Sequence, residues 1–409
     1  MKTNESGREE WSRHIDNSLV DSAACVRKTT DGGFIIVGGT GGRRSCSGGL
    51  DCLPGVGKLS PDLYLLKTDP LGTVLWSRVV GGEDGDMGRS VVESREGGFA
   101  VVGSTFTKNN WDMYVLRTDP EGKTLWERTF GGPREDNGRE LVESETGGYF
   151  VVGKYRHLPP PGDRQVDDAY VVKLSRDGEL NWERRFPGGR RLLSLDRFGD
   201  GGVVIVGVSS VTGTVNLYVV RIDELGNPIW ERTYCEGIGV AVRRVERGFI
   251  VLSLSSCGFN RASLLKIDEE GELIWHGCYR GPRAGYGFIP LADGSYVVAG
   301  ETRDAGGADA FLGKVRSGFF TRGDIDGDGG LTVADALGVL RALFRGGELS
   351  CLDSGDVDDS GQLDITDAVA TLLYVFAGGP EPADPGFSAG CGGDPTRDLL
   401  DCEAHPKCR

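Results

Sequence analysis

The segment GGFIIVG at residues 32–38 decides the fold, because the same pattern returns along the chain. In each copy a glycine-containing turn leads into a short apolar run, which is typical of a buried β-strand. Six copies occur, 46 to 65 residues apart, at residues 32–38, 97–103, 147–153, 201–207, 247–253 and 293–300. A repeat of this length and composition is typical of the four-stranded blade of a β-propeller.

Each copy is followed by two further strand-like segments. The first ends in a basic residue, as in DLYLLK at residues 62–67, and a tight turn such as DPLG at residues 69–72 comes next. Aspartate caps the backbone of such a turn, and glycine accepts its left-handed position. The second segment carries one tryptophan in five of the repeats: Trp76, Trp126, Trp182, Trp230 and Trp275. Because this tryptophan recurs once per blade, we interpret it as blade packing rather than as a ligand platform.

The sixth repeat stops at Val315 without a tryptophan strand, and a matching strand lies at the other end of the chain. The segment EWSR at residues 10–13 matches LWSR at residues 75–78. An N-terminal strand that completes the last blade closes a propeller and removes an exposed sheet edge. The sequence therefore predicts a mainly β chain in which residues 1–315 form a six-bladed propeller closed by the strand around Trp11.

A second motif appears twice near the C-terminal end of the sequence. Residues 324–335 and 356–367 each fit a twelve-residue calcium loop, with a glycine at the sharp bend at position 6. Calcium takes six to eight oxygen ligands, and alternate residues of such a loop point inward. The predicted ligands of two calcium ions are Asp324, Asp326, Asp328, Gly330, Thr332 and Asp335 in the first loop, and Asp356, Asp358, Ser360, Gln362, Asp364 and Asp367 in the second.

Each loop runs into an expected amphipathic helix, at residues 333–344 and 365–376, and no convincing helix precedes either loop. This duplicated loop–helix, over residues 322–377, resembles the type I dockerin family. The resemblance implies a small α-helical domain that folds with calcium and docks onto a cohesin-like protein or a surface assembly. Loop positions 10 and 11, commonly Ser-Thr in cellulosomal dockerins, are Val-Ala and Ile-Thr in this chain.

Composition limits the partners and the location. The formal net charge is −15, with 17 acidic and 6 basic residues from Arg322 onward, which argues against nucleic acid as a partner. No run of about 18 apolar residues is present, so no membrane span is expected. Ten cysteines without a CxxC pair favour disulfides in an exported, extracellular or cell-surface protein, although residues 1–18 contain no visible signal peptide. Residues 316–321 are expected to be a linker, and residues 378–409 a Gly/Pro- and Cys-rich tail.

The loops expected on one propeller face contain further candidates for ligand contact. Acidic side chains in two of these loops suit calcium or sugar hydroxyls, and they equally suit turn capping. Trp111 lies outside the once-per-blade series, so it is a better candidate for stacking. The candidates are Asp84, Asp86, Trp111, Glu135, Asp136 and His157.

Two classes of function follow from these features. The first is an exported binding or scaffold protein whose propeller recognises a glycan or a protein and whose loop–helix domain anchors it. The second is a polysaccharide-degrading hydrolase or lyase, since dockerins often accompany such enzymes. The sequence contains no HExxH, GxSxG or GxxxxGK[ST] motif, but paired carboxylates for glycoside cleavage leave no local motif.

Overall fold

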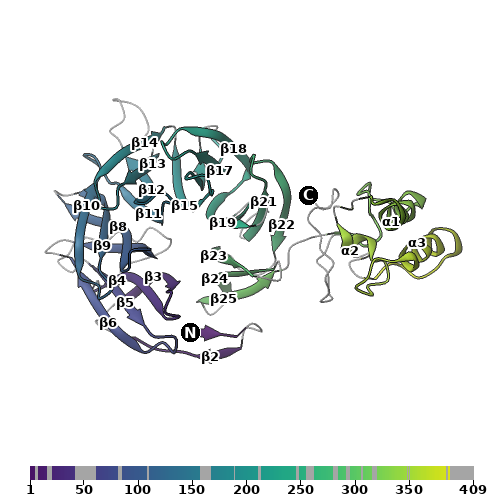
Figure 1. The fold of residues 1–409 in the computed structure, drawn as a ribbon, viewed down its shortest axis with the longest axis horizontal. Coiled ribbons are helices and arrows are strands. Elements are labelled where there is room, and N and C mark those ends of the chain that lie inside the picture. Colours follow the sequence, from purple (N-terminus) through teal and green to yellow (C-terminus); the bar gives the residue numbers. More distant parts are fainter. Residues whose placement is uncertain are drawn as a thin grey trace. The chain divides into compact units, whose positions relative to one another are not determined.

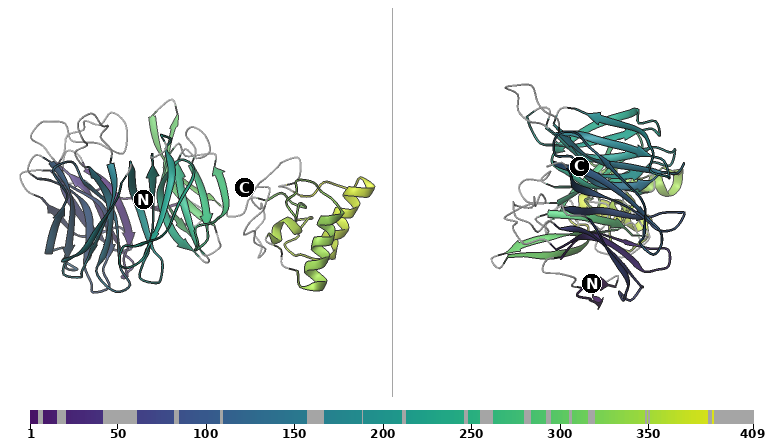
Figure 2. Two further views of the ribbon diagram at one scale, coloured as in Figure 1. Left: turned by 90° about the horizontal axis from the view of Figure 1, so that it is seen from above. Right: turned by 90° about the vertical axis from the view of Figure 1, so that its left-hand side faces the viewer.

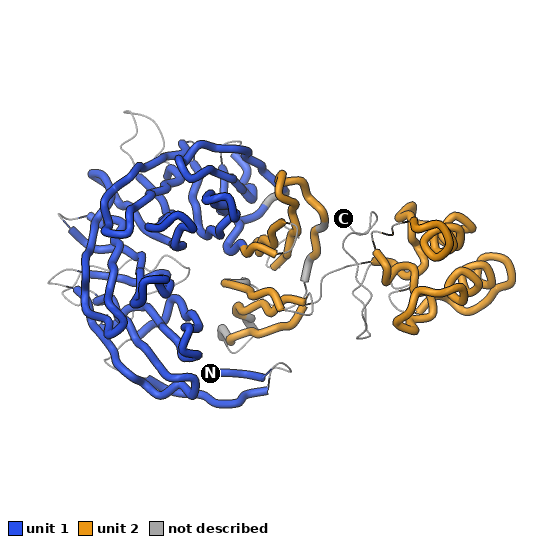
Figure 3. The backbone as a smooth tube through the Cα atoms, viewed as in Figure 1, with its two compact units in different colours: residues 1–242 blue, residues 243–409 orange. Residues whose placement is uncertain are grey.

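The fold was analysed in a computed structural model of the chain. It describes residues 1–4, 8–15, 21–41, 61–81, 85–107, 110–156, 167–187, 189–210, 213–245, 248–254, 262–279, 284–291, 295–304, 307–315, 320–347, 349, 351–383 and 386. The described chain divides into two compact units, residues 1–242 and residues 243–409 (Figure 3).

Six antiparallel sheets make a six-bladed β-propeller, as the repeats predict (Figure 1). Within each sheet the strands follow one another in sequence order. The first three blades are β3 (Asp21–Lys28), β4 (Phe34–Thr40), β5 (Asp62–Thr68) and β6 (Val74–Val80); β7 (Asp86–Glu93), β8 (Phe99–Thr107), β9 (Asn110–Thr118) and β10 (Thr124–Phe130); and β11 (Asn137–Glu143), β12 (Tyr149–Arg156), β13 (Asp167–Leu174) and β14 (Leu180–Phe186).

The remaining blades repeat this order, except that the last described sheet has three strands. They are β15 (Arg190–Arg197), β16 (Val203–Ser209), β17 (Asn216–Ile222) and β18 (Pro228–Glu236); β19 (Ile238–Val245), β20 (Gly248–Leu254), β21 (Ala262–Ile267) and β22 (Leu273–Tyr279); and β23 (Ala284–Pro290), β24 (Tyr296–Asp304) and β25 (Gly307–Val315).

The core of the first unit consists of apolar layers between successive blades. Side chains of β4 and β5 pack against β7, β8 and β9, and equivalent clusters join the second blade to the third and the third to the fourth. Strands such as β16 are buried along their whole length, so they carry unbroken apolar runs rather than alternating ones. The apolar segments that follow the glycine turns are therefore the second strands of the blades.

Three of the outer-strand tryptophans, Trp76, Trp126 and Trp182, join neighbouring blades, as their interpretation as packing residues predicts. Trp76 lies over Gly122, a turn glycine of the next blade with a φ of +78°, and an added Cβ there would be 2.6 Å from the indole ring. Trp126 and Trp182 meet the following turns in the same way, and each indole N–H donates to a carbonyl of that turn at 3.1 Å. Only glycine fits under these rings.

The N-terminal strand differs from the expectation in its pairing but not in its packing. β2 (Glu9–Trp11) pairs with β1 (Lys2–Thr3), and the described strand pairs include none between β2 and β25. β2 has only three residues, and the partner that the structure gives it is the preceding segment of the chain. The Trp11 ring still covers Gly72 and lies 6.1 Å from the Phe34 ring, which repeats the contacts that Trp76 makes with Gly122 and Phe99.

The C-terminal part contains three helices, α1 (Val333–Arg345), α2 (Leu352–Gly355) and α3 (Ile365–Ala377). α1 and α3 lie side by side (Figure 2), and Ala336, Val339 and Ala368 form their buried contact. α2 is a single turn immediately before the second loop, where no helix was expected. No helix among the described residues combines the length and hydropathy needed to cross a membrane.

The cysteines are described in part. Cys351 is disulfide-bonded, and Cys25 carries a free thiol. The loop that contains Cys46 and Cys52, and nearly all of the expected tail, also lie outside the described residues.

Candidate metal centre

The last residues of each predicted loop are also the first residues of a helix. Thr332 is the N-cap of α1 and Asp364 is the N-cap of α3. The side chains of Asp335 and Asp367, three residues further on, accept from the backbone N–H of those caps at 2.8 and 2.9 Å. This capping box satisfies N–H groups that a helix start leaves without partners. Loop positions 9 and 12 therefore belong both to the loop and to the first turn of its helix.

The carboxylates of each loop converge. In the first loop Asp324, Asp326 and Asp328 each place an oxygen within 4.8 Å of the others, and in the second loop Asp356, Asp358 and Asp367 do the same. The position-1 and position-12 carboxylates of both loops are fully buried: Asp324, Asp335, Asp356 and Asp367. Burial of several negative groups so close together is costly unless a cation is shared among them.

The loop backbone wraps around the first carboxylate in both copies. The N–H of Gly361 donates to the Asp356 carboxylate at 2.8 Å, and the N–H of Gly329 donates to the Asp324 carboxylate at 3.2 Å. Both glycines have left-handed backbone, with φ of +89° at Gly329 and +78° at Gly361. They are the sharp bends that the sequence predicts at position 6.

The electrostatics of the second loop reflect this crowding. Burial raises the pKa of Asp367 to about 6, against hydrogen bonds from backbone N–H groups that lower it, and the charges of Asp356 and Asp358 raise it further. Burial also raises the pKa of Asp356, while nearby Arg322 acts in the opposite direction. The second loop thus holds its carboxylates in a setting that disfavours their charge until a cation is present.

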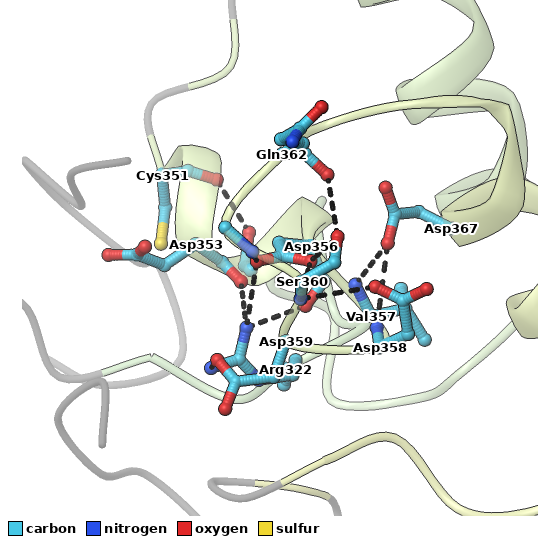
Figure 4. Close-up of polar contacts among 12 residues, drawn as sticks. Arg322, Cys351, Asp353, Asp356, Val357, Asp358, Asp359, Ser360, Gln362 and Asp367 are labelled. Atoms are coloured by element: carbon cyan, nitrogen blue, oxygen red, sulfur yellow. Dashed lines mark hydrogen bonds and ion pairs between the residues drawn. The ribbon is translucent and has the colours of Figure 1, made fainter. Parts of the chain in front are cut away.

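The remaining predicted ligands lie on the same loops in supporting positions. Ser360 donates from its hydroxyl to the Asp356 carboxylate and to the Gln362 carbonyl, both at 3.3 Å (Figure 4). Gly330 donates from its N–H to the Asp328 carboxylate at 2.7 Å. Every predicted donor is a carboxylate, hydroxyl or carbonyl oxygen, which fits a hard divalent cation and does not fit metals that prefer sulfur or nitrogen.

The sequence analysis did not single out Arg322 or Asp359, which meet at the second loop. The buried side chain of Arg322 reaches across to this loop, where it meets the carboxylate of Asp359 (Figure 4). An alignment of the two repeats would have pointed to both residues, because Arg322 stands opposite Ser354 and Asp359 stands opposite Gly327.

The helices leave apolar side chains exposed on their outer faces. Phe344 and Phe376 occupy equivalent positions near the ends of α1 and α3, with 70% and 73% of their surface exposed. Leu337, Val369 and Leu373 are about half exposed on the same two helices. Apolar surface of this kind is typical of contact sites for other proteins.

The acidic candidates on the propeller face are used within the fold. Asp136 is fully buried and accepts from the backbone N–H of Gly132 at 2.6 Å and of Arg156 at 2.7 Å. Burial raises its pKa to about 6, and the neighbouring Asp112 carboxylate adds to this. Glu135 forms ion pairs with Lys154 and Arg156. The contacts of Asp136 are those of a turn cap, and Glu135 is engaged in ion pairs.

The other candidates on this face are placed only in part. Asp86 is buried at the start of β7. Trp111 packs edge-to-face on Phe106, with ring centroids 5.5 Å apart. Asp84 and His157 lie outside the described residues, so the structure does not gather the six candidates into one site.

Comparisons with known proteins add little at this level of similarity. No protein-family model and no curated protein matches the chain. A protein of unknown function from Bacteroides caccae is 12% identical with a TM-score of 0.43, and the match covers 67% of this chain and 87% of that one. A GH43_1 enzyme from Xanthomonas citri is 12% identical with a TM-score of 0.36, and the match covers 63% and 92%. For Sqt1 from Chaetomium thermophilum the values are 11%, 0.36, 73% and 88%. TM-scores this low carry no argument about function.

Proposed function

We propose that this protein is an exported binding protein in which a calcium-dependent, dockerin-like module anchors a β-propeller. The two clusters of three carboxylates carry the proposal, because each sits in a full-length calcium loop that starts a helix. The calcium ligands would be the twelve loop residues named above. When bound, the ion would neutralise carboxylates that repel one another and would hold the loop against its helix.

Docking onto a protein partner is supported by the outer faces of the helices. Val333 and Ile365 stand at loop position 10, next to the exposed Leu337 and Val369, so the surface is more apolar than the Ser-Thr pattern of cellulosomal dockerins. A partner that matches it would present an apolar patch with basic residues at its rim, because the module is strongly acidic. A cohesin-like protein of a surface assembly fits this description.

The disulfide at Cys351 supports an oxidising location, since disulfides persist mainly in exported proteins. The propeller would supply recognition, and its ligand would be a glycan or a protein. A glycan array probed with the full chain tests that part independently of the metal.

Calcium titration of the full chain by calorimetry, after removal of metal with EDTA, tests the proposal. We expect two ions per chain, and we expect uptake to be lost in the double variant D324N/D356N. The control is D177N, which changes an exposed turn aspartate of the propeller and should leave uptake intact. A wild-type chain that takes up no calcium would overturn the proposed function.

A further inference from the structure

Arg322 is a fully buried arginine two residues before the first metal loop, yet its partners belong to the second. Its Nη1 donates to the carbonyl of Asp353 at 3.2 Å and to the carbonyl of Asp356 at 2.6 Å. Its Nη2 donates to the carboxylate of Asp359 at 2.7 Å (Figure 4). A buried guanidinium is tolerated when its donors meet acceptors in this way.

The main chain adds a second link between the segments that enter the two loops. The N–H of Gly323 donates to the carbonyl of Ser354 at 2.7 Å. Arg322 and Gly323 therefore fasten the entrance of the first loop to the entrance of the second. A displacement of one loop would be transmitted to the other through these contacts.

The two loops are not equivalent, although the sequence duplicates them. Ser354 aligns with Arg322. Its hydroxyl donates to the carbonyl of Cys351 at 2.8 Å, so this side chain bonds within its own segment rather than to the first loop. Position 4 has left-handed backbone in both loops, with φ of +69° at Gly327 and +59° at Asp359. Asp359 is the only non-glycine residue with positive φ in the described chain, in a conformation that favours glycine.

The two departures from the repeat thus meet in one ion pair. Asp359 stands at a position that is not a metal ligand in such loops, and its carboxylate binds the arginine that only the first repeat carries. The charge of the guanidinium is then offset by Asp359. The guanidinium also lies 3.8 Å from the Asp356 carboxylate, so Asp359 reduces the positive charge that an incoming cation would otherwise meet beside this ligand.

We propose that Arg322 is a positioning residue that makes the two loops unequal in calcium binding. It holds the second loop in its ion-binding form before metal arrives, so the second loop takes the first ion and the first loop takes the second. This inference rests on the proposed calcium function. The physical reason is that a loop already held in shape loses less conformational freedom on binding.

The test is a calcium titration of the full chain and its variants after metal removal. The position-3 variants D326N and D358N assign the two binding events, and D358N should abolish the tighter one. R322K retains the charge but not the planar fork that spans two carbonyls and a carboxylate. It should weaken the tighter event about tenfold and change the weaker event much less.

Two further variants sharpen the result. R341K changes an exposed arginine of α1 and should alter neither event. D359N keeps a residue that tolerates left-handed backbone but removes the charge, so it should weaken the same event as R322K, to a smaller extent. The inference is overturned if D326N removes the tighter event, if R322K leaves both affinities unchanged, or if R322K lowers both equally, as a general loss of structure would.

A chain that binds no calcium would overturn the proposed function without deciding the role of Arg322. Limited proteolysis in EDTA separates the two. If Arg322 holds the second loop, cleavage within residues 356–364 should be faster in R322K than in the wild type or in R341K. Equal cleavage rates would overturn the positioning role by itself.

Discussion

The propeller and the C-terminal module are built around different kinds of buried contact. Between the blades, unbroken apolar strands and tryptophans placed over glycines bury surface in contacts that need no added ligand. In the module the buried apolar cluster between the two long helices is small, with Ala336, Val339 and Ala368 at its centre, while four aspartates are buried in the loops. The first part is therefore stabilised by its own side chains, and under the proposed function the second would depend on a bound cation.

Removal of calcium should have the largest effect, and it should act on the module alone. EDTA should unfold α1 and α3, because the buried carboxylates then repel one another, and the helical part of the circular-dichroism spectrum should disappear. All seven tryptophans lie in residues 1–315, so tryptophan fluorescence reports only on the propeller and should stay unchanged. Identical spectra and melting temperatures with and without EDTA would contradict the comparison.

The converse perturbation is W126A in the propeller. Removal of this ring should cost about 3 kcal/mol of unfolding free energy, because both the interblade packing and the hydrogen bond to the Arg176 carbonyl are lost. Urea unfolding followed by the remaining tryptophans measures the change, and calcium uptake should not alter. The control W111A removes a ring that is seen to pack on Phe106 and should cost less. Equal costs would show that the interblade position has no special weight.

A pH effect of intermediate size is expected in the propeller. The pKa of Asp136 is raised to about 6 in the folded propeller from 3.8, so the folded state binds this proton more tightly than the unfolded chain. The stability contributed by the protonated group is therefore lost as the pH rises through about 6, by about 1.5 kcal/mol between about pH 5 and pH 7. Urea midpoints across this range should fall in the wild type and level out in D136N. A slope that persists in D136N would assign it to other groups.

The smallest expected effect concerns the N-terminal strand. W11A should lower the unfolding free energy of the propeller by about 1 kcal/mol, less than W126A, because the buried indole N–H of Trp11 has no hydrogen-bond partner among the residues that the structure describes. Urea unfolding in parallel with W76A measures the difference. No loss at all would mean that the contact with Gly72 adds nothing to the stability of the first blade.

The repeats were sufficient to predict the blades and their turns. The period, the aspartate and glycine of each turn and the apolar runs are local signals, and they led to the correct sheet order. The pairing of β2 was missed because a match such as EWSR indicates which strand is similar, not which edge receives its hydrogen bonds. The strand pairs instead with β1, a segment that the sequence pattern did not single out.

The convergence of carboxylates in each loop was predictable because the residues concerned lie within twelve positions of one another. Arg322 was not, because its partners at Asp353, Asp356 and Asp359 lie more than 30 residues further along the chain. The acidic residues on the propeller face show the opposite limit. Their residue types suit a ligand, but whether Asp136 faces solvent or a backbone N–H depends on how the neighbouring turn folds.

The placement of outer-strand tryptophans such as Trp76, Trp126 and Trp182 over a glycine of the next blade also bears on how such a chain can change length. A blade of this kind provides a tryptophan on its outer strand for the next blade and a turn glycine for the tryptophan of the preceding blade. Insertion or removal of a complete repeat therefore leaves each tryptophan paired with a glycine. Truncation inside a repeat would instead leave an indole ring without the turn glycine on which it packs. We therefore expect the propeller to tolerate insertion or deletion of whole repeats, and to be destabilised by insertion or deletion of part of a repeat.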